Sequence, residues 1–368
     1  MKGKLWFSLM VSAMLCTGHS MAYSASAYAV ISADTGVLLD RMQENQRLPM
    51  ASTTKIMTGL LAAEETDIDR IITVSDTCAG IEGSSMYLQA GEQLPLRDVL
   101  YGLMLCSGND AAECIAEECG GRETFVQRMN DRAQEMGLTD THFDNPSGLD
   151  GATHYTTAYE LAKLAAEALK NETFAEVVAT KSYTSGTRTM VNHNKMLRLY
   201  PDAIGVKTGY TMTAGRCLVS AAKRNGRTVI AVTLNDRNDW NDHVQMLEDA
   251  FAGMQEQQWA KKGDMVCSIP VQTGTDRAVD AVYAESLSGF LLQGETAELE
   301  LSCVDFLYAP VKKGTVCGTA RVVCGDTVLG ETELLCGSEV QLDTAQEDLS
   351  RKERFLLWWD RLRKRVVT

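Results

Sequence analysis

Residues 215–234 read GRCLVSAAKRNGRTVIAVTL, two apolar runs joined by Lys-Arg-Asn-Gly. Asn-Gly between apolar runs is the strongest short-range signal for a β-hairpin, because both residues tolerate the positive φ angles of its turn. A strand is also predicted from Ala203, and helical spacing over residues 241–254 predicts a helix after the hairpin. This region therefore predicts neighbouring strands of one antiparallel sheet and a helix that follows them.

Strands are predicted again near the start of the chain. Apolar residues 27–31 and 37–39 flank Ser-Ala-Asp-Thr-Gly, which are typical turn residues. Between the two strand regions, apolar residues recur mainly at helical spacing as far as about Asn171. Helices are predicted there over residues 52–65, 96–104, 110–118 and 157–169. Strands at both ends with a helical subdomain inserted between them predict an α+β fold, whose antiparallel sheet is assembled from distant parts of the chain.

A second domain is predicted after a polar segment at residues 255–262. Runs such as residues 265–269, 297–301 and 315–323 alternate in part with period two and are separated by Gly-containing turns. This pattern predicts a small all-β domain over residues 262–343. The length of 368 residues accommodates this domain beside a larger one over residues 26–255.

The chain is acidic, with 35 Lys and Arg against 49 Asp and Glu and a formal net charge of −14. Nucleic-acid binding rests on clustered Lys and Arg, so we expect no nucleic-acid partner. Hydrophobic residues make up 45% of the chain, which is typical of a folded globular protein and not of a disordered one.

The two ends of the chain are basic and apolar. Residues 1–25 carry Lys2 and Lys4, an apolar stretch and small residues, which is typical of a secretory signal peptide; an uncleaved anchor is the alternative. In residues 344–368, aromatic and aliphatic side chains recur at helical spacing among Arg and Lys. We expect an amphipathic helix in a membrane interface, or alternatively one packed on the β domain. The two ends thus predict an exported protein at the extracytoplasmic face of a cytoplasmic membrane.

Ten cysteines follow the predicted signal peptide. An even number in an exported protein allows disulfides, but the spacings form no regular framework, so buried free thiols are an equal alternative. No Cys-x-x-Cys pair with a nearby His indicates zinc, and no metal is expected.

Residues 52–55 read Ser-Thr-Thr-Lys at the start of a predicted helix. Positions i and i+3 share a helix face, so Lys55 can reach the Ser52 hydroxyl and act as the base that a serine nucleophile needs. The Ser-x-x-Lys pattern recurs at Ser220 and Lys223 in a predicted strand, where i and i+3 point to opposite faces. Only the first copy is therefore a candidate catalytic pair.

Residues 107–109 read Ser-Gly-Asn in a turn between two predicted helices. The Ser107 hydroxyl could relay a proton, and the Asn109 amide could bind both a lysine and a substrate carbonyl. A plain connecting turn is the alternative.

Residues 207–209 read Lys-Thr-Gly on a predicted strand. The lysine and the hydroxyl could receive a carboxylate, and Gly209 permits close backbone approach by a ligand. An ordinary exposed strand end is the alternative.

These motifs, in this order, resemble the active-site set of penicillin-binding proteins and serine β-lactamases. The chain most resembles the low-molecular-mass penicillin-binding proteins that are D-alanyl-D-alanine carboxypeptidases, and the likeness extends over residues 49–58, 105–112, 145–149 and 205–211. The resemblance implies the penicillin-binding protein/β-lactamase-like transpeptidase fold for residues 26–255. The trailing β domain and the C-terminal segment also fit that architecture.

The resemblance implies a role for each motif residue. Ser52 would attack the penultimate D-Ala of a peptidoglycan stem peptide that ends in D-Ala-D-Ala, with Lys55 as base and Ser107, supported by Asn109, as proton relay. Lys207 would supply positive potential, Thr208 would bind the terminal carboxylate, and the backbone N–H groups of Ser52 and Tyr210 would form the oxyanion hole. β-Lactam antibiotics would be covalent inhibitors, and no cofactor is implied.

One arginine and four histidines lie outside these motifs. Related enzymes hold the terminal carboxylate with an arginine after the last core strand, for which Arg237 is the nearest candidate. The dispersed histidines are expected to be structural, and they are His142, His154, His193 and His243.

Two other functions remain open. A serine β-lactamase would use the same motifs, although the extra β domain and the lack of an assignable deacylating glutamate argue against it. A catalytically idle penicillin-binding sensor would keep the fold, although the intact motifs argue against that.

Overall fold

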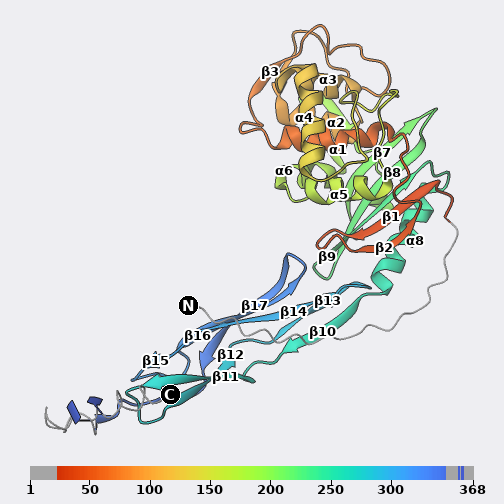
Figure 1. Ribbon diagram of the computed structural model, residues 1–368. Coiled ribbons are helices and arrows are strands. Elements are labelled where there is room, and N and C mark those ends of the chain that lie inside the picture. The colour runs from red at the N-terminus through yellow and green to blue at the C-terminus, as the bar shows by residue number, and fades with distance from the viewer. Residues whose placement is uncertain (1–22, 345–354, 357, 360–368) are drawn as a thin grey trace. The chain divides into compact units, whose positions relative to one another are not determined.

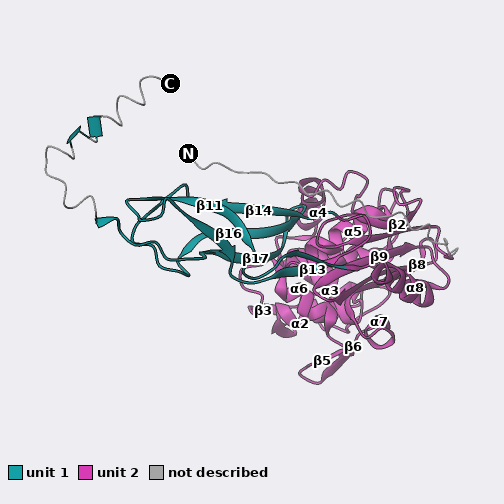
Figure 2. Ribbon diagram, turned by 90° about the horizontal axis from the view of Figure 1, so that it is seen from below, with its two compact units in different colours: residues 1–11, 256–289, 296–368 teal, residues 12–255, 290–295 magenta. Residues whose placement is uncertain are grey.

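The computed structural model describes residues 23–344, 355–356 and 358–359 (Figure 1). Residues 1–22 of the predicted signal peptide and most of the predicted C-terminal helix lie outside these residues. The chain divides into two compact units (Figure 2). The first contains the described residues up to Gln255 together with Phe290–Glu295, and the second contains Glu256–Gly289 and the described residues from Thr296 onward.

An antiparallel five-stranded sheet forms the centre of the first unit, in the order β2-β1-β9-β8-β7. Its strands are β1 (Ala27–Ser32), β2 (Leu38–Met42), β7 (Ala203–Thr211), β8 (Gly215–Arg224) and β9 (Arg227–Leu234). Asn225 and Gly226 have φ angles of 52° and 79°, so the predicted Asn-Gly hairpin is confirmed. Because β1 pairs with β9, the two ends of the unit meet in one sheet, as the α+β prediction requires.

The helical subdomain is inserted between β2 and β7 (Figure 1). Its helices are the 3-10 helix η1 (Ala51–Thr54), α1 (Lys55–Ala63), α2 (Leu96–Leu105), α3 (Asn109–Glu118), α4 (Arg122–Glu135), α5 (Ala158–Ala168), α6 (Glu172–Ala179) and α7 (Met196–Leu199). Two short hairpins accompany them, β3 (Ile71–Thr73) with β4 (Gln93–Pro95) and β5 (Ser182–Ser185) with β6 (Arg188–Val191). The predicted helices are all present, within a few residues of their predicted bounds.

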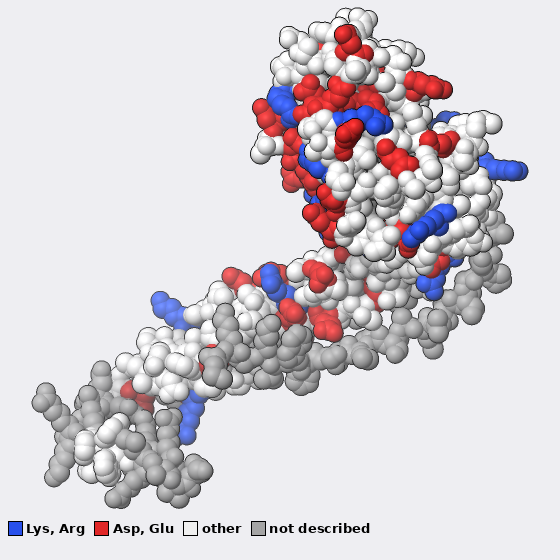
Figure 3. Space-filling view, turned by 45° about the horizontal axis from the view of Figure 1, so that its top comes forward, with Lys and Arg blue, Asp and Glu red and all other residues white. Residues whose placement is uncertain are grey.

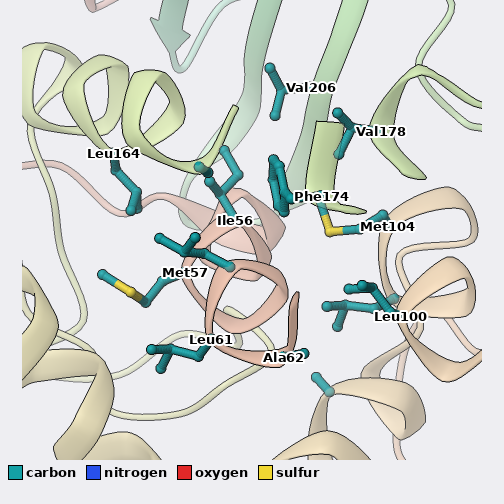
Figure 4. Packing of buried hydrophobic residues seen from close by; sticks show 14 of the residues in the cluster. Ile56, Met57, Leu61, Ala62, Leu100, Met104, Leu164, Phe174, Val178 and Val206 are labelled. Atoms are coloured by element: carbon teal, nitrogen blue, oxygen red, sulfur yellow. The ribbon is translucent and has the colours of Figure 1, made fainter. Parts of the chain in front are cut away.

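Helix α1 lies at the centre of the main core, and all nine of its residues are buried. Figure 4 shows its apolar side chains among those of neighbouring elements, including Leu100 and Met104 of α2, Leu164 of α5, Phe174 of α6 and Val206 of β7. A helix that is buried all round cannot shift without opening this core. The start of α1, where Lys55 lies, is therefore held rigidly.

The opposite face of the sheet is covered by α8 (Asp239–Ala252). On β8, Leu218 packs in the cluster with Met246 and Leu247 of α8, whereas its neighbour Val219 packs in the main core. This alternation is that of a strand buried on both faces. Acidic side chains are spread over the visible surface of the first unit, with basic ones between them (Figure 3).

The second unit is almost entirely β-structure, which confirms the predicted all-β class. A six-stranded sheet runs in the order β14-β16-β17-β12-β11-β15. The strands of this region are β10 (Gln255–Ala260), β11 (Met265–Gln272), β12 (Ala278–Tyr283), β13 (Leu287–Leu291), β14 (Glu298–Cys303), β15 (Leu307–Tyr308), β16 (Val316–Cys324) and β17 (Thr327–Cys336). The polar segment that begins at Gln255 thus contains a strand, β10, which pairs with β13; Ala260 is buried in the core of this unit.

Candidate active site

Ser52 lies on η1, the single 3-10 turn that leads directly into α1. Ala51, just before it, has a φ angle of 48°, in the left-handed region that non-glycine residues rarely adopt. The Lys55 Nζ atom donates a hydrogen bond to the Ser52 Oγ atom over 3.0 Å. The predicted contact between the two side chains is therefore present, although Ser52 belongs to a 3-10 turn and not to the α-helix itself.

The Lys55 amine is fully buried among oxygen atoms. It donates to Asn109 Oδ1 over 2.7 Å and to the backbone carbonyl of Ser147 over 2.5 Å. Burial, and then the positive charge of Lys207, lower the Lys55 pKa well below its usual value. A neutral amine has two N–H groups and one lone pair. In that form the amine can donate to the two carbonyl oxygens, and the hydrogen bond to Ser52 reverses, so that the hydroxyl donates to the lone pair.

Ser107 and Asn109 lie where α2 ends and α3 begins. Ser107 has a φ angle of 60°, a strained conformation of the kind that occurs at functional sites. The Asn109 Nδ2 atom donates to the carbonyl of Glu82 over 2.6 Å, which fixes the orientation of the amide and aims its oxygen at Lys55. The Ser107 hydroxyl accepts a hydrogen bond from Lys207 Nζ over 2.9 Å.

Lys207, Thr208 and Gly209 lie on β7, an edge strand of the sheet. The Lys207 side chain is buried, and burial lowers its pKa to about 7. A Cβ atom on Gly209 would lie 3.1 Å from the backbone nitrogen of Ser52. The backbone of η1 therefore occupies the space beside Gly209 in which the sequence predicts a ligand. This contact places β7 against the turn that carries the nucleophile.

A pocket of about 600 Å³ opens over these groups. It contains five predicted residues and six others, namely Ser52, Ser107, Thr208, Gly209 and Tyr210, with Ser84, His193, Arg216, Cys217, Asp239 and Trp240. Lys55, Asn109 and Lys207 are buried and join the pocket through their hydrogen bonds to Ser52, to Lys55 and to Ser107. All eight predicted site residues thus come together.

Arg216 is a pocket residue that the sequence motifs did not indicate. Its guanidinium group binds both carboxylate oxygens of Asp239, over 3.0 and 2.7 Å, and lies 5.8 Å from the centre of the Trp240 ring. Arg216 pairs with Tyr210 across β8 and β7, two positions beyond Thr208, so all three share one face of the sheet. Pairing the predicted strands across the turn at residues 212–214 could have found it. Arg237, the candidate suggested by the sequence, is exposed and does not line the pocket.

Two of the four histidines named above are structural, as expected. His154 accepts from the backbone of Asp144 and contacts Thr54 Oγ1 over 2.7 Å, and His243 lies between Ser220 and Thr233. His193 differs, because it lines the pocket. Burial, and then Lys207, lower the pKa of His193.

The described residues also bear on metal binding, disulfides and membrane-spanning helices. Among the described residues, no group of His, Cys, Asp and Glu side chains is arranged to hold a metal ion. The ten described cysteines are free thiols in this structure. Within the same part of the chain, none of the helices combines the length and apolar character needed to cross a bilayer.

Comparison with known proteins gives two family matches, one after the other along the chain. Residues 15–238 match the family model described as D-alanyl-D-alanine carboxypeptidase, and residues 255–342 match that of the penicillin-binding protein 5 C-terminal domain. The D-alanyl-D-alanine carboxypeptidase DacF of Bacillus subtilis is 32% identical over 338 residues, which cover 87% of each chain. A D-alanyl-D-alanine carboxypeptidase of a Streptomyces species is 40% identical over 223 residues, 54% of this chain and 77% of that protein.

Solved structures give the same picture of the fold. Penicillin-binding protein 5 of Haemophilus influenzae superposes with a TM-score of 0.64 at 24% identity, over 88% of this chain and 99% of that one. A Streptomyces DD-transpeptidase superposes with a TM-score of 0.61 at 33% identity, over 64% of this chain and all of that one. The fold is thus that of the penicillin-binding proteins with a C-terminal all-β domain, and the chain belongs to the D-alanyl-D-alanine carboxypeptidase family.

Proposed function

We propose that the protein is a serine D,D-carboxypeptidase that removes the terminal D-Ala from peptidoglycan stem peptides and is inhibited by β-lactams. The observation that carries the proposal is the buried Lys55 amine, which contacts the Ser52 hydroxyl and two carbonyl oxygens in a chain of this family. Burial, and then the charge of Lys207, favour the neutral form of this lysine, whose lone pair can accept the proton of the nucleophile.

Acylation begins when Ser52 Oγ attacks the carbonyl carbon of the penultimate D-Ala and its proton passes to Lys55 Nζ. The negative charge that develops on the carbonyl oxygen is received by the backbone N–H groups of Ser52 and Tyr210. The contact between η1 and the edge strand β7 supports this assignment, because Gly209 brings the two backbones together.

The terminal D-Ala leaves when its nitrogen takes the Ser107 hydroxyl proton, which Lys207 replaces. The hydrogen bond between Lys207 Nζ and Ser107 Oγ and the Lys207 pKa of about 7 support this relay, since such a group gains and loses a proton near neutral pH. Before deacylation, Lys55 loses to solvent the proton that it took from Ser52, and Lys207 regains one from solvent. Water then attacks the acyl carbonyl and gives one proton to the neutral Lys55, which passes it to the Ser52 oxygen as that oxygen is released.

Arg216 and Thr208 bind the terminal carboxylate of the substrate. Arg216 is a better candidate than Arg237 for binding this carboxylate, because Arg216 lines the pocket and shares a sheet face with Thr208. Asp239 uses one edge of the guanidinium group, and the remaining N–H donors are free to bind a second carboxylate.

The test incubates purified protein with a peptide ending in D-Ala-D-Ala and, separately, with labelled penicillin. Release of free D-Ala and a long-lived penicilloyl adduct on Ser52, both lost in Ser52→Ala, are expected. Rapid penicillin turnover would instead identify a β-lactamase. Penicillin binding without D-Ala release would identify an idle sensor, and neither activity would also overturn the proposal.

The protein acts outside the cytoplasm, where peptidoglycan is found, and its C-terminal segment holds it at the cytoplasmic membrane. Phe355, Leu356, Trp358 and Trp359 support this, since they are helical and exposed apolar residues within a basic sequence. Truncation after Ala345 should release the exported protein from membranes into the soluble fraction. If the truncated protein still sediments with membranes, another part of the chain anchors it.

A further inference from the structure

Two cysteines meet inside the all-β unit. Cys267 lies on β11 and Cys303 ends β14, and their Sγ atoms are 3.3 Å apart. Both side chains are half-buried and pack against the hydrophobic core of this unit. At this separation the two thiols touch, but no disulfide bond joins the sulfur atoms.

The strands that carry these cysteines are far apart in the sheet. Three strands, β16, β17 and β12, separate β14 from β11. In a flat sheet, four strand spacings would put β14 and β11 about 19 Å apart. The sheet therefore curls until its two sides meet across the core, and the thiol pair lies where they meet.

Strand β14 has little freedom to move away from this contact. Gly318 of β16 pairs with Cys303, and a Cβ atom on Gly318 would lie 3.0 Å from the Cys303 Cα atom and 2.3 Å from the carbonyl oxygen of Ser302. The two strands are thus closely apposed at the position of the cysteine. Only a small rearrangement would bring the two sulfur atoms to the bonding distance of about 2.05 Å.

We propose that Cys267 and Cys303 are a disulfide-forming site that staples the curled sheet when the protein meets a low-molecular-mass disulfide. The thiolate of one cysteine attacks a sulfur of that reagent, which forms a mixed disulfide and releases one thiol. The second cysteine then attacks the mixed disulfide and releases the other thiol. Two protein thiols are thereby oxidised to one disulfide, and the reagent disulfide is reduced to two thiols.

Accessibility separates this pair from the other neighbouring thiols. Cys78 and Cys114 also interact through their thiols in the first unit, and Cys317 and Cys336 do so in the second. All four are only 1% exposed, so a reagent cannot reach them in the folded protein. Among these three pairs, a disulfide is therefore predicted for Cys267 and Cys303 alone.

The experiment treats the purified full-length folded protein with a graded series of oxidised and reduced glutathione. Intact mass should fall by about 2 Da, the two hydrogen atoms lost when one disulfide forms. Peptide mapping under non-reducing conditions should join the peptide that contains Cys267 to the one that contains Cys303. The linked protein should also unfold at a temperature at least about 5 °C higher, because the link restricts the unfolded chain.

The matched variants are Cys267→Ser, which should abolish both the mass loss and the linked peptide, and Cys324→Ser, which alters another cysteine of the same unit and should abolish neither. The proposal is overturned if an excess of oxidised glutathione leaves the mass unchanged or produces only a glutathione adduct. It is also overturned if Cys267 is linked to a cysteine other than Cys303, or if the link fails to raise the unfolding temperature.

Discussion

Lys55 and Lys207 are two lysines buried in one site, and each is at most 1% exposed. Burial disfavours the charged form of both, and the charge of Lys207 further lowers the pKa of Lys55. A charged Lys207 therefore helps to keep Lys55 neutral. This gives the two lysines different tasks, one as a base beside Ser52 and the other as a proton donor beside Ser107.

Lys55→Arg should greatly slow the acylation of Ser52. Arginine does not lose its proton in proteins, so it cannot accept one from Ser52. We expect labelled penicillin to acylate this variant at least about 100-fold more slowly, the size of a typical general-base contribution. Lys223→Arg is the matched control, because it alters the lysine of the second Ser-x-x-Lys copy, which is exposed on β8. Equal acylation rates for the two variants would contradict the role of Lys55.

Arg216→Gln should weaken recognition of the substrate's terminal carboxylate. The measurement compares kcat/KM for a peptide ending in D-Ala-D-Ala with that for the same peptide ending in an amide. The native enzyme should prefer the carboxylate, and the variant should lose about 10-fold or more of that preference, since hydrogen bonds to charged groups contribute about 1.5–3 kcal/mol. Arg237→Gln should keep the preference. A preference that survives in Arg216→Gln would refute this residue's role without affecting the proposed reaction.

At the scale of elements, the nucleophile is positioned by three backbone segments that touch. η1 carries Ser52, β7 passes it at Gly209, and the loop at Gly148 lies against the other side of Ala51. A Cβ atom on Gly148 would lie 2.0 Å from the carbonyl oxygen of Ala51, and Gly148 has a φ angle of 89°. The same loop supplies the Ser147 carbonyl that binds Lys55.

Gly148→Ala should both destabilise the protein and slow acylation. The new methyl group would displace the turn that carries Ser52, and we expect a loss of at least about 3 kcal/mol in the free energy of unfolding. Gly137→Ala is the control, because Gly137 has a φ angle of 69° but a Cβ atom added there would meet nothing within 4 Å. It should cost only the backbone strain of about 1–2 kcal/mol and leave acylation unchanged. Urea unfolding and penicillin acylation measure the two effects, and equal losses would contradict the close contact.

At the scale of the whole molecule, buried neutral histidines make stability depend on pH. Burial lowers the pKa of His243 to about 3 and that of His154 to about 4, against about 6.5 in an unfolded chain. Below pH 6.5 the unfolded chain binds protons that the folded protein resists. The two buried histidines therefore contribute their full stabilisation above about pH 6.5. This contribution is lost as the pH falls towards the folded-state pKa of each, about 4 for His154 and about 3 for His243.

At pH 5, each of these histidines should cost about 2 kcal/mol of stability relative to pH 7. Urea unfolding at the two pH values measures the loss. In His243→Gln the difference between pH 7 and pH 5 should shrink by about 2 kcal/mol. A His243→Gln variant with the parent's full pH dependence would show that His243 takes up no proton on unfolding.

Much of the fold could be predicted from local signals. The Asn-Gly turn and its apolar flanks predicted β8 and β9, and helical spacing predicted α1 with Lys55 within reach of Ser52. The residues of these motifs are adjacent in the chain, so their spacing alone carries the information. Their order along the chain then predicted the α+β class and the family.

Only the tertiary structure decided which distant groups complete the site. The Ser147 carbonyl beneath Lys55 and Arg216 beside Thr208 lack a local signature, and the contact of Cys267 with Cys303 requires the sheet to curl. Local turn chemistry and periodicity determine which segments become helices and strands. The register, curvature and close packing of those segments determine which side chains meet, because such contacts depend on the positions of many residues far apart in the sequence.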